Sequence, residues 1–171
     1  QDKSGWFREN AFLAHEKAAT LHTIAYAARG LLEVGVMAGR QDCIDAADRA
    51  AGALYRGWRL YETVSGAYAR DWQVSADWRC LPGEAQTAII WLRLHQLLGR
   101  EDYRTTALAL LEQLKTAQIL DEDNADLHGG ISGSLPINDS YERYCLVNWG
   151  PKFLVDALLL KDCKNGEHPT G

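Results

Sequence analysis

Six side chains in this sequence are candidates for general acid–base work. The carboxylates are those of Glu84, Glu142, Asp71 and Asp77, while His22 and Tyr141 offer an imidazole and a phenol that can move protons. Glycoside hydrolysis needs two carboxylates across the scissile bond, whereas epimerisation or elimination at a uronate needs one base and one acid. Each residue also has a structural alternative. Glu84 suits the first turn of a helix, where a carboxylate stabilises the helix dipole, and His22 suits packing against a backbone carbonyl.

Aromatic residues and one arginine have the chemistry of a ligand-binding surface. The flat faces of Trp78, Trp149 and Tyr144 suit stacking on the C–H face of a sugar ring, and Arg79 suits a bidentate grip on a carboxylate. The alternative is that the tryptophans fill a helical core. We expect that role for Trp91, which occupies an apolar position in the middle of a helical pattern.

No metal or other cofactor is indicated by the sequence. The four cysteines lie far apart and form no C-x-x-C pair, which argues against a zinc ribbon and against a dense disulfide framework. The segment Gly129–Ser134 is rich in glycine, but no Lys-Ser or Lys-Thr pair follows it. We therefore interpret it as a flexible loop bordering a pocket, not as a phosphate cradle.

Composition limits the classes of partner. The chain has 171 residues and a net charge of −5, with its basic residues dispersed, so it lacks the basic patch that nucleic acid binding demands. The longest apolar run, Ala157–Leu160, is far too short to span a bilayer. We expect one soluble, cytoplasmic domain with no nucleic-acid or membrane partner. Because the chain starts at Gln1, a processed start and a fragment of a longer protein both remain open.

The elements that must position these residues are predicted by an internal repeat at an offset of 60 residues. Leu21, Gly39 and Arg40 recur as Leu81, Gly99 and Arg100, as do several further residues, without a gap. Each copy reads as a helix, a Gly-Arg-x-Asp turn and a second helix. Gly39 and Gly99 are predicted to end the first helices in the left-handed conformation, and Thr20 is predicted to cap the first helix.

The predicted helices cover most of the chain outside two long connections. We expect a tail over residues 163–171 and a short helix over Gly5–Lys17. We expect functional loops over Trp58–Cys80 and Ile119–Val147, because loops of that length in a compact domain are usually functional. The hairpin repeats are expected at about 20–57, 81–118 and 147–162, the last being an apolar helix without an outer partner, within a single domain spanning 1–171.

The pattern resembles an α/α-toroid, the fold of six-hairpin glycosidases, terpenoid cyclases and protein prenyltransferases. It is most similar to toroid proteins found near bacterial polysaccharide genes and to the helical C-terminal domain of glucuronyl C5-epimerases. The segments that carry the resemblance are Gly5–Phe7, Leu21–Tyr26 with Arg29–Glu33, Gly83–Gln86, Gly129–Ser134 and Asn148–Trp149. It implies an all-α fold of repeated antiparallel helical hairpins forming a partial toroid.

The resemblance also implies where a site lies, because the pocket of such toroids is lined by the amino-terminal ends of the inner helices and the loops before them. The residues this selects for catalysis are Glu84, His22, Tyr141 and Glu142, and those it selects for substrate binding are Tyr26, Trp78, Arg79, Tyr144, Asn148 and Trp149. Helix amino termini favour anions, which suits an acidic, uronate-type saccharide.

The sequence leaves two alternatives open for the function and two for the partner. A carbohydrate-related protein that binds or acts on an acidic saccharide is one, and a non-catalytic helical-repeat module for binding or assembly is the other, so whether the chain is an enzyme stays open. About three hairpins are present where a closed ring takes six or seven. The apolar inner helices therefore need cover, from a second copy in a homodimer or from an absent amino-terminal half.

Overall fold

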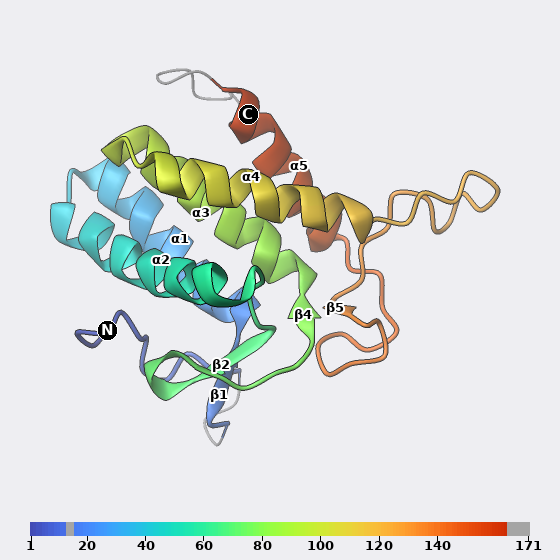
Figure 1. Cartoon of the computed structure of the whole chain (residues 1–171), viewed down its shortest axis with the longest axis horizontal. Coiled ribbons are helices and arrows are strands. Elements are labelled where there is room, and N and C mark those ends of the chain that lie inside the picture. The colour runs from blue at the N-terminus through green and yellow to red at the C-terminus, as the bar shows by residue number, and fades with distance from the viewer. Residues whose placement is uncertain (13–15, 164–171) are drawn as a thin grey trace.

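The computed structural model describes residues 1–12 and 16–163 and is built mainly from helices. Within these residues the helices are α1 (Leu21–Ala38), α2 (Gln41–Tyr61), α3 (Leu81–Leu98), α4 (Glu101–Thr116) and α5 (Trp149–Asp162). In Figure 1, α2 and α4 form the front layer, and α1, α3 and α5 lie behind them. Helix α3 is central, because it packs against all four other helices. None of these helices is long and apolar enough to cross a membrane.

Two tight turns of the same construction connect α1 to α2 and α3 to α4. Gly39 and Gly99 both take the predicted left-handed conformation, with φ of 63° and 69°. The arginine that follows each glycine makes a bidentate pair with the aspartate two residues later, Arg40 with Asp42 and Arg100 with Asp102. The residues repeated in the sequence therefore perform the same local task in each turn.

The prediction of an all-α fold is confirmed only in part, because the structure also contains short strands. Within the described residues, β1 (Ala18–Thr20), β2 (Ala67–Ala69) and β3 (Gln73–Val74) form one antiparallel sheet, and β4 (Arg79–Cys80) pairs with β5 (Ser134–Leu135). A single 3-10 turn lies at Arg70–Trp72 between β2 and β3. The two connections that were expected to be loops thus hold backbone pairings that fix the starts of α1 and α3.

The predictions for the amino-terminal region are wrong in two respects. The side chain of Thr20 makes no capping bond, because β1 pairs with β2 there and the Leu21 backbone N–H donates to the carbonyl of Gly66 at 2.8 Å. No helix occurs in the described residues of the segment 5–17, whose positions 13–15 lie outside the described part of the chain. Backbone pairing between distant segments replaces both expected local features.

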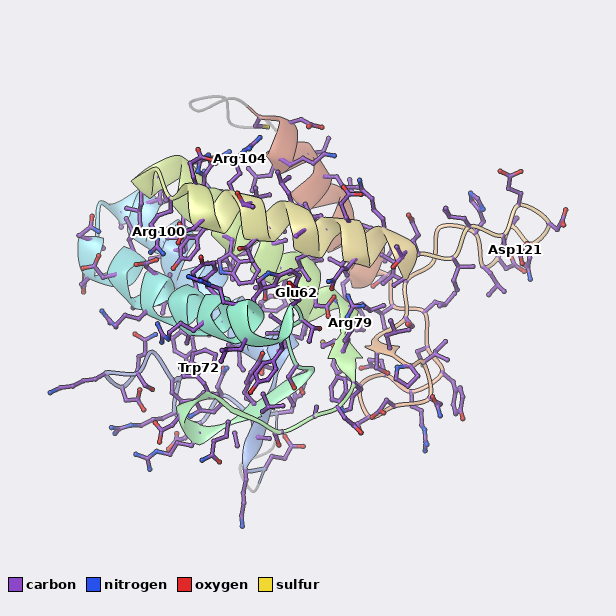
Figure 2. The ribbon with its side chains drawn as sticks, viewed as in Figure 1. Glu62, Trp72, Arg79, Arg100, Arg104 and Asp121 are labelled. Atoms are coloured by element: carbon purple, nitrogen blue, oxygen red, sulfur yellow. The ribbon has the colours of Figure 1, made fainter. Side chains whose placement is uncertain are left out.

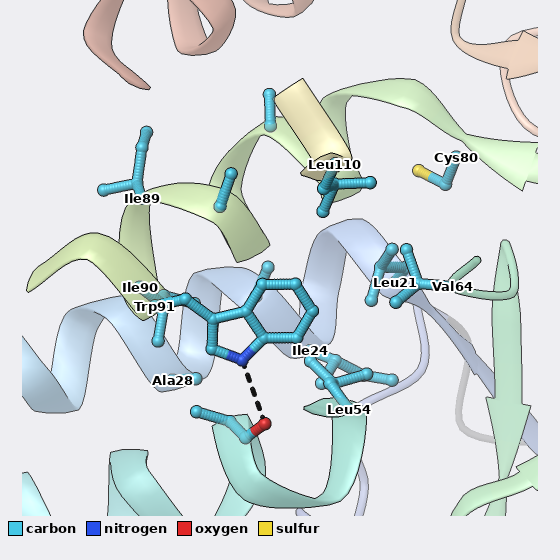
Figure 3. Packing of buried hydrophobic residues seen from close by; sticks show 14 of the residues in the cluster. Leu21, Ile24, Ala28, Leu54, Val64, Cys80, Ile89, Ile90, Trp91 and Leu110 are labelled. Carbon is cyan, nitrogen blue, oxygen red and sulfur yellow. Dashed lines mark hydrogen bonds between the residues drawn. The ribbon is translucent and has the colours of Figure 1, made fainter. Parts of the chain in front are cut away.

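The core surrounds the first two-thirds of α3, where every residue from Leu81 to Leu92 is buried. Trp91 is fully buried, as its sequence position predicts, and its indole N–H donates to the carbonyl of Ala51 in α2 at 3.1 Å (Figure 3). Figure 3 shows leucine and isoleucine side chains of α1 and α3 around this indole. Because α3 is apolar on all sides, any polar side chain on it is enclosed by neighbouring helices.

Candidate functional site

The starts of α1 and α5 bring together a cluster of aromatic rings. The His22 imidazole lies 4.8 Å from the Tyr26 ring and 5.7 Å from the Tyr141 ring, measured between ring centroids. Trp149 and Phe153 of α5 lie 6.4 and 6.1 Å from His22. The structure therefore gathers four of the predicted site residues, which are separated by more than a hundred positions in sequence. We call this group, together with the adjoining start of α3, the three-helix junction.

Glycines allow the helices of the three-helix junction to approach so closely. A Cβ atom on Gly83, in the first turn of α3, would lie 2.8 Å from the backbone nitrogen of His22. A Cβ atom on Gly150, in the first turn of α5, would lie 3.2 Å from Ile131 in the preceding loop. Any larger residue at Gly83 would push the start of α3 away from α1. These glycines position the polar groups described next.

His22 is a buried, neutral histidine. Its exposed fraction is 9 %, and burial lowers its pKa to about 4. The imidazole is therefore uncharged at neutral pH, which suits a hydrogen-bonding role and weakens its role as a general base. Its Nδ1 atom has no hydrogen-bond partner in residues 1–12 and 16–163. The backbone carbonyl partner that would make this a purely structural histidine is therefore not found for Nδ1.

Two further side chains near the three-helix junction have buried polar atoms without a partner in the described chain. They are Gln86, at both amide atoms, and Ser134, at its hydroxyl. Gln86 is 1 % exposed and lies one turn beyond Gly83, while Ser134 is fully buried and pairs in register with Cys80, next to the start of α3. The indole N–H of Trp149 faces the Tyr141 phenol oxygen, an interaction that favours the phenolate and opposes the rise of the Tyr141 pKa. An unmade hydrogen bond at a buried polar atom costs about 1–3 kcal/mol, so Gln86 and Ser134 lower the stability of the free protein.

Exposed predicted residues lie beside this buried group. Tyr26 is 56 % exposed and Tyr144 is 68 % exposed, and Glu142 and Asn148 are also exposed. Glu142 and Tyr144 both have positive φ angles, 51° and 58°, which are strained for residues with a side chain. Burial raises the pKa of the neighbouring Tyr141 phenol, so it stays protonated and can donate.

Arg29 and Lys152 both pair with the same carboxylate, Asp156, beside the three-helix junction. Arg29 of α1 lies 3.6 Å from Asp156 of α5, and its guanidinium is 5.7 Å from the Phe153 ring centre. Lys152 pairs with the same Asp156 and lies 4.8 Å from the same ring. Two cations therefore share one anion beside the aromatic cluster, which favours an anionic ligand there.

Arg79 and Glu84, which were predicted to grip a substrate carboxylate and to act as a base, are bonded to each other. The Arg79 Nε and Nη2 atoms lie 2.7 and 2.6 Å from the two carboxylate oxygens. Glu84 is fully buried, and burial raises its pKa to about 7 although Arg79 opposes the shift. Trp78 is also buried, because its ring packs on Gly66. The Glu84 side chain makes no cap to the α3 amino terminus.

No family model, curated protein or solved structure matches this chain. Within the described residues no group of three or more His, Cys, Asp or Glu side chains is arranged to hold a metal ion.

Sequence reasoning located part of the three-helix junction and missed part of it. It singled out His22, Tyr26, Tyr141 and Trp149, which the structure brings together, but it passed over Gln86, Ser134 and Phe153. One signal was present for Gln86, since it is an amide at the start of the mostly apolar stretch that runs to Leu92. Burial of that amide depends on α1 and α5, whose packing against α3 no local pattern describes.

Proposed function

We propose that this chain binds an acidic, uronate-type saccharide at the three-helix junction. The observation that carries the proposal is the set of buried polar atoms without a protein partner, on His22, Gln86 and Ser134. Sugars present many hydroxyl groups that both donate and accept, and so they can satisfy an imidazole, an amide and a hydroxyl together. Whether a reaction follows binding is left open by this proposal.

The surroundings of the buried polar atoms suit the two other features of a uronate. The exposed face of Tyr26 offers a platform for the C–H face of a sugar ring. Arg29 and Lys152, which share Asp156, offer positive charge for a carboxylate. Two helix starts, those of α1 and α3, add partial positive charge from their backbone N–H groups.

The same proposal treats the helices as an arc of an α/α-toroid. Two features support it, namely the matching Gly-Arg-x-Asp turns between α1 and α2 and between α3 and α4, and the contacts of α3 with both α1 and α5. In that arrangement α1, α3 and α5 are inner helices and α2 and α4 are outer ones. The three-helix junction then lies at the amino-terminal ends of the inner helices, where such folds carry their ligand sites.

Titration with oligosaccharides tests the binding proposal. We expect measurable heat from an oligogalacturonate or an oligoglucuronate and none from a neutral cello-oligosaccharide, with binding that weakens as salt is added. Tyr26→Ala should weaken binding about fivefold, because a stacked aromatic ring contributes about 1 kcal/mol. Tyr61→Ala is the matched control, since Tyr61 is similarly exposed on α2. Absence of binding by every acidic saccharide, or equal loss in both variants, would refute the proposal.

A second candidate function is that of a non-catalytic assembly module. It is favoured by exposed apolar residues on α1 and α5, the two helices at the ends of the proposed arc. Val34 and Met37 on α1 are 56 % and 87 % exposed, and Val155 and Leu159 on α5 are 52 % and 58 % exposed. Such faces suit cover by a second copy or by further hairpins. We expect a homodimer by light scattering after size exclusion, and dissociation of it by Met37→Glu. A strict monomer at all concentrations would argue against the homodimer.

A further inference from the structure

A groove separate from the three-helix junction lies between the carboxyl-terminal half of α2 and the segment 63–79. Its volume is about 850 Å³. The apolar part of its lining includes Leu60, Tyr61, Trp72 and Val74, and three of these are more than half exposed, at 74 % for Leu60, 64 % for Tyr61 and 57 % for Val74. In Figure 2, Trp72 is labelled below α2, and Arg79 is labelled at β4, to the right of the carboxyl-terminal end of α2. The groove is large and apolar enough for a small planar ligand.

Arg79 connects this groove to a buried carboxylate. Its side chain is 23 % exposed and lines the groove, while the carboxylate that it holds, on Glu84, is fully enclosed. The pairing uses Nε and Nη2, and the structure gives Nη1 no hydrogen bond within the described residues. A guanidinium has five N–H donors, so Arg79 retains donors for a second carboxylate. Arg56, on α2, adds a second cation to the lining.

The other titratable groups around this pair are few. Tyr68 of β2 and Cys80 of β4 lie close enough to Glu84 for its charge to raise their pKa values, and both are themselves buried. Asp71 and Asp77 also line the groove, and Asp71 lies 3.7 Å from Arg70 in an exposed ion pair. Glu84 is the buried acid that pairs with Arg79. Protonation of Glu84 would therefore remove the negative charge that faces the guanidinium from inside the protein.

We propose that the groove binds a small organic carboxylate with a planar apolar body, whose carboxylate engages the Arg79 guanidinium while Glu84 takes up one proton from solvent. The apolar body lies against Tyr61 and Trp72. Proton uptake leaves Glu84 as a neutral acid, which is far less costly to bury than a carboxylate that shares its cation. This inference uses Arg79, Tyr61 and Trp72, which the saccharide proposal does not use, and it shares with the three-helix junction only Glu84, at the start of α3.

The linkage gives the inference a distinct pH dependence. Burial raises the pKa of Glu84 to about 7. Above that pH Glu84 is charged in the free protein and must acquire a proton on binding, so affinity should fall by up to about tenfold for each pH unit. Below that pH Glu84 is already protonated, and affinity should level off. A neutral side chain at position 84 should remove the dependence.

The experiment is calorimetric titration with 3-phenylpropanoate from pH 6 to pH 9, with 3-phenylpropanamide as the uncharged control. Wild-type protein should bind the acid more weakly as pH rises from 7 to 9, with uptake of one proton at pH 8 measured in two buffers of different ionisation enthalpy. Glu84→Gln should bind with the low-pH affinity throughout. Glu33→Gln is the matched control, because Glu33 holds Arg93 in a similar pair elsewhere, at 3.1 and 3.2 Å.

The outcomes separate the possibilities. No binding of 3-phenylpropanoate at pH 6 by wild-type protein would overturn the inference, as would binding without proton uptake at pH 8. Equal binding of the acid and the amide would show that Arg79 is not engaged and would also overturn it. If Glu84→Gln fails to fold, the two-buffer measurement on wild-type protein decides alone. Tyr61→Ala should weaken 3-phenylpropanoate and leave saccharide binding intact, whereas Tyr26→Ala should do the reverse.

Discussion

Arg79→Ala is expected to lower the free energy of unfolding by about 1 kcal/mol more at pH 8 than at pH 5, because it leaves the enclosed Glu84 without its partner. Without Arg79 the buried carboxyl should stay protonated at pH 8, one unit above its pKa of about 7 in the wild type, and one pH unit corresponds to about 1.4 kcal/mol. Glu84 has a folded-state pKa near 7, raised from 4.5, so at pH 5 the folded protein already holds it as a neutral acid. Its contribution therefore opposes folding as pH rises from about 4.5 to 7, and the arginine matters most above that range.

Urea denaturation of wild-type and variant protein at both pH values checks this expectation. Arg93→Ala is the control, since its partner Glu33 is 35 % exposed and the pair should contribute about 1 kcal/mol or less at either pH. Adding Glu84→Leu to Arg79→Ala should recover the extra loss at pH 8, because the buried carboxyl is then absent. A loss of equal size at pH 5 and pH 8 would mean that Arg79 acts through packing and not through charge.

The parts of the fold that could be predicted are those with local causes. Gly39 and Gly99 end their helices because glycine adopts positive φ without strain, and the arginine and aspartate beside each glycine bond to one another within the turn. The same reasoning failed at Thr20, whose side chain has the right chemistry for a cap. At that position β1 pairs with β2, nearly fifty residues away in sequence, and this backbone pairing sets the conformation of the chain before α1.

The short strands could not be predicted because they are consequences of tertiary placement. A strand such as β4 has two residues, Arg79 and Cys80, and shows no alternation that a sequence could reveal. Its pairing with β5 nevertheless places Ser134 opposite Cys80 and so brings one of the buried hydroxyls to the start of α3. The pairing of Arg79 with Glu84 is likewise five residues apart in sequence, yet both side chains were predicted to face a ligand.

The candidate site likewise contains residues that the sequence indicates and residues that only the packed structure reveals. His22 and Trp149 stood out because their types are chemically active and they begin helical patterns. Gln86 did not stand out, because its significance depends on being enclosed by α1 and α5 as they pack against α3. Polar groups of this kind are recognised only when the surrounding helices are in place, since burial converts an ordinary amide into one that lacks a partner.

Gln86→Leu is expected to raise the stability of the free protein and to remove saccharide binding. The amide of Gln86 is 1 % exposed, and neither of its polar atoms has a partner in the described chain. Replacing it with an apolar side chain of similar size removes the cost of burying these atoms, which should raise the free energy of unfolding by about 1–2 kcal/mol. The same change deletes two hydrogen bonds that a ligand would complete, so affinity for an oligouronate should fall at least about tenfold.

Thr87→Val provides the matched control on the next residue of α3. Thr87 is fully buried, but its hydroxyl donates to the Gly83 carbonyl at 2.8 Å, so its loss should lower stability by about 1 kcal/mol and leave saccharide binding in place. Opposite signs in the two stability measurements would separate an uncompensated polar group from a satisfied one. If Gln86→Leu instead destabilises the protein, the amide has a partner in the protein in solution, and the three-helix junction loses the observation on which the binding proposal depends.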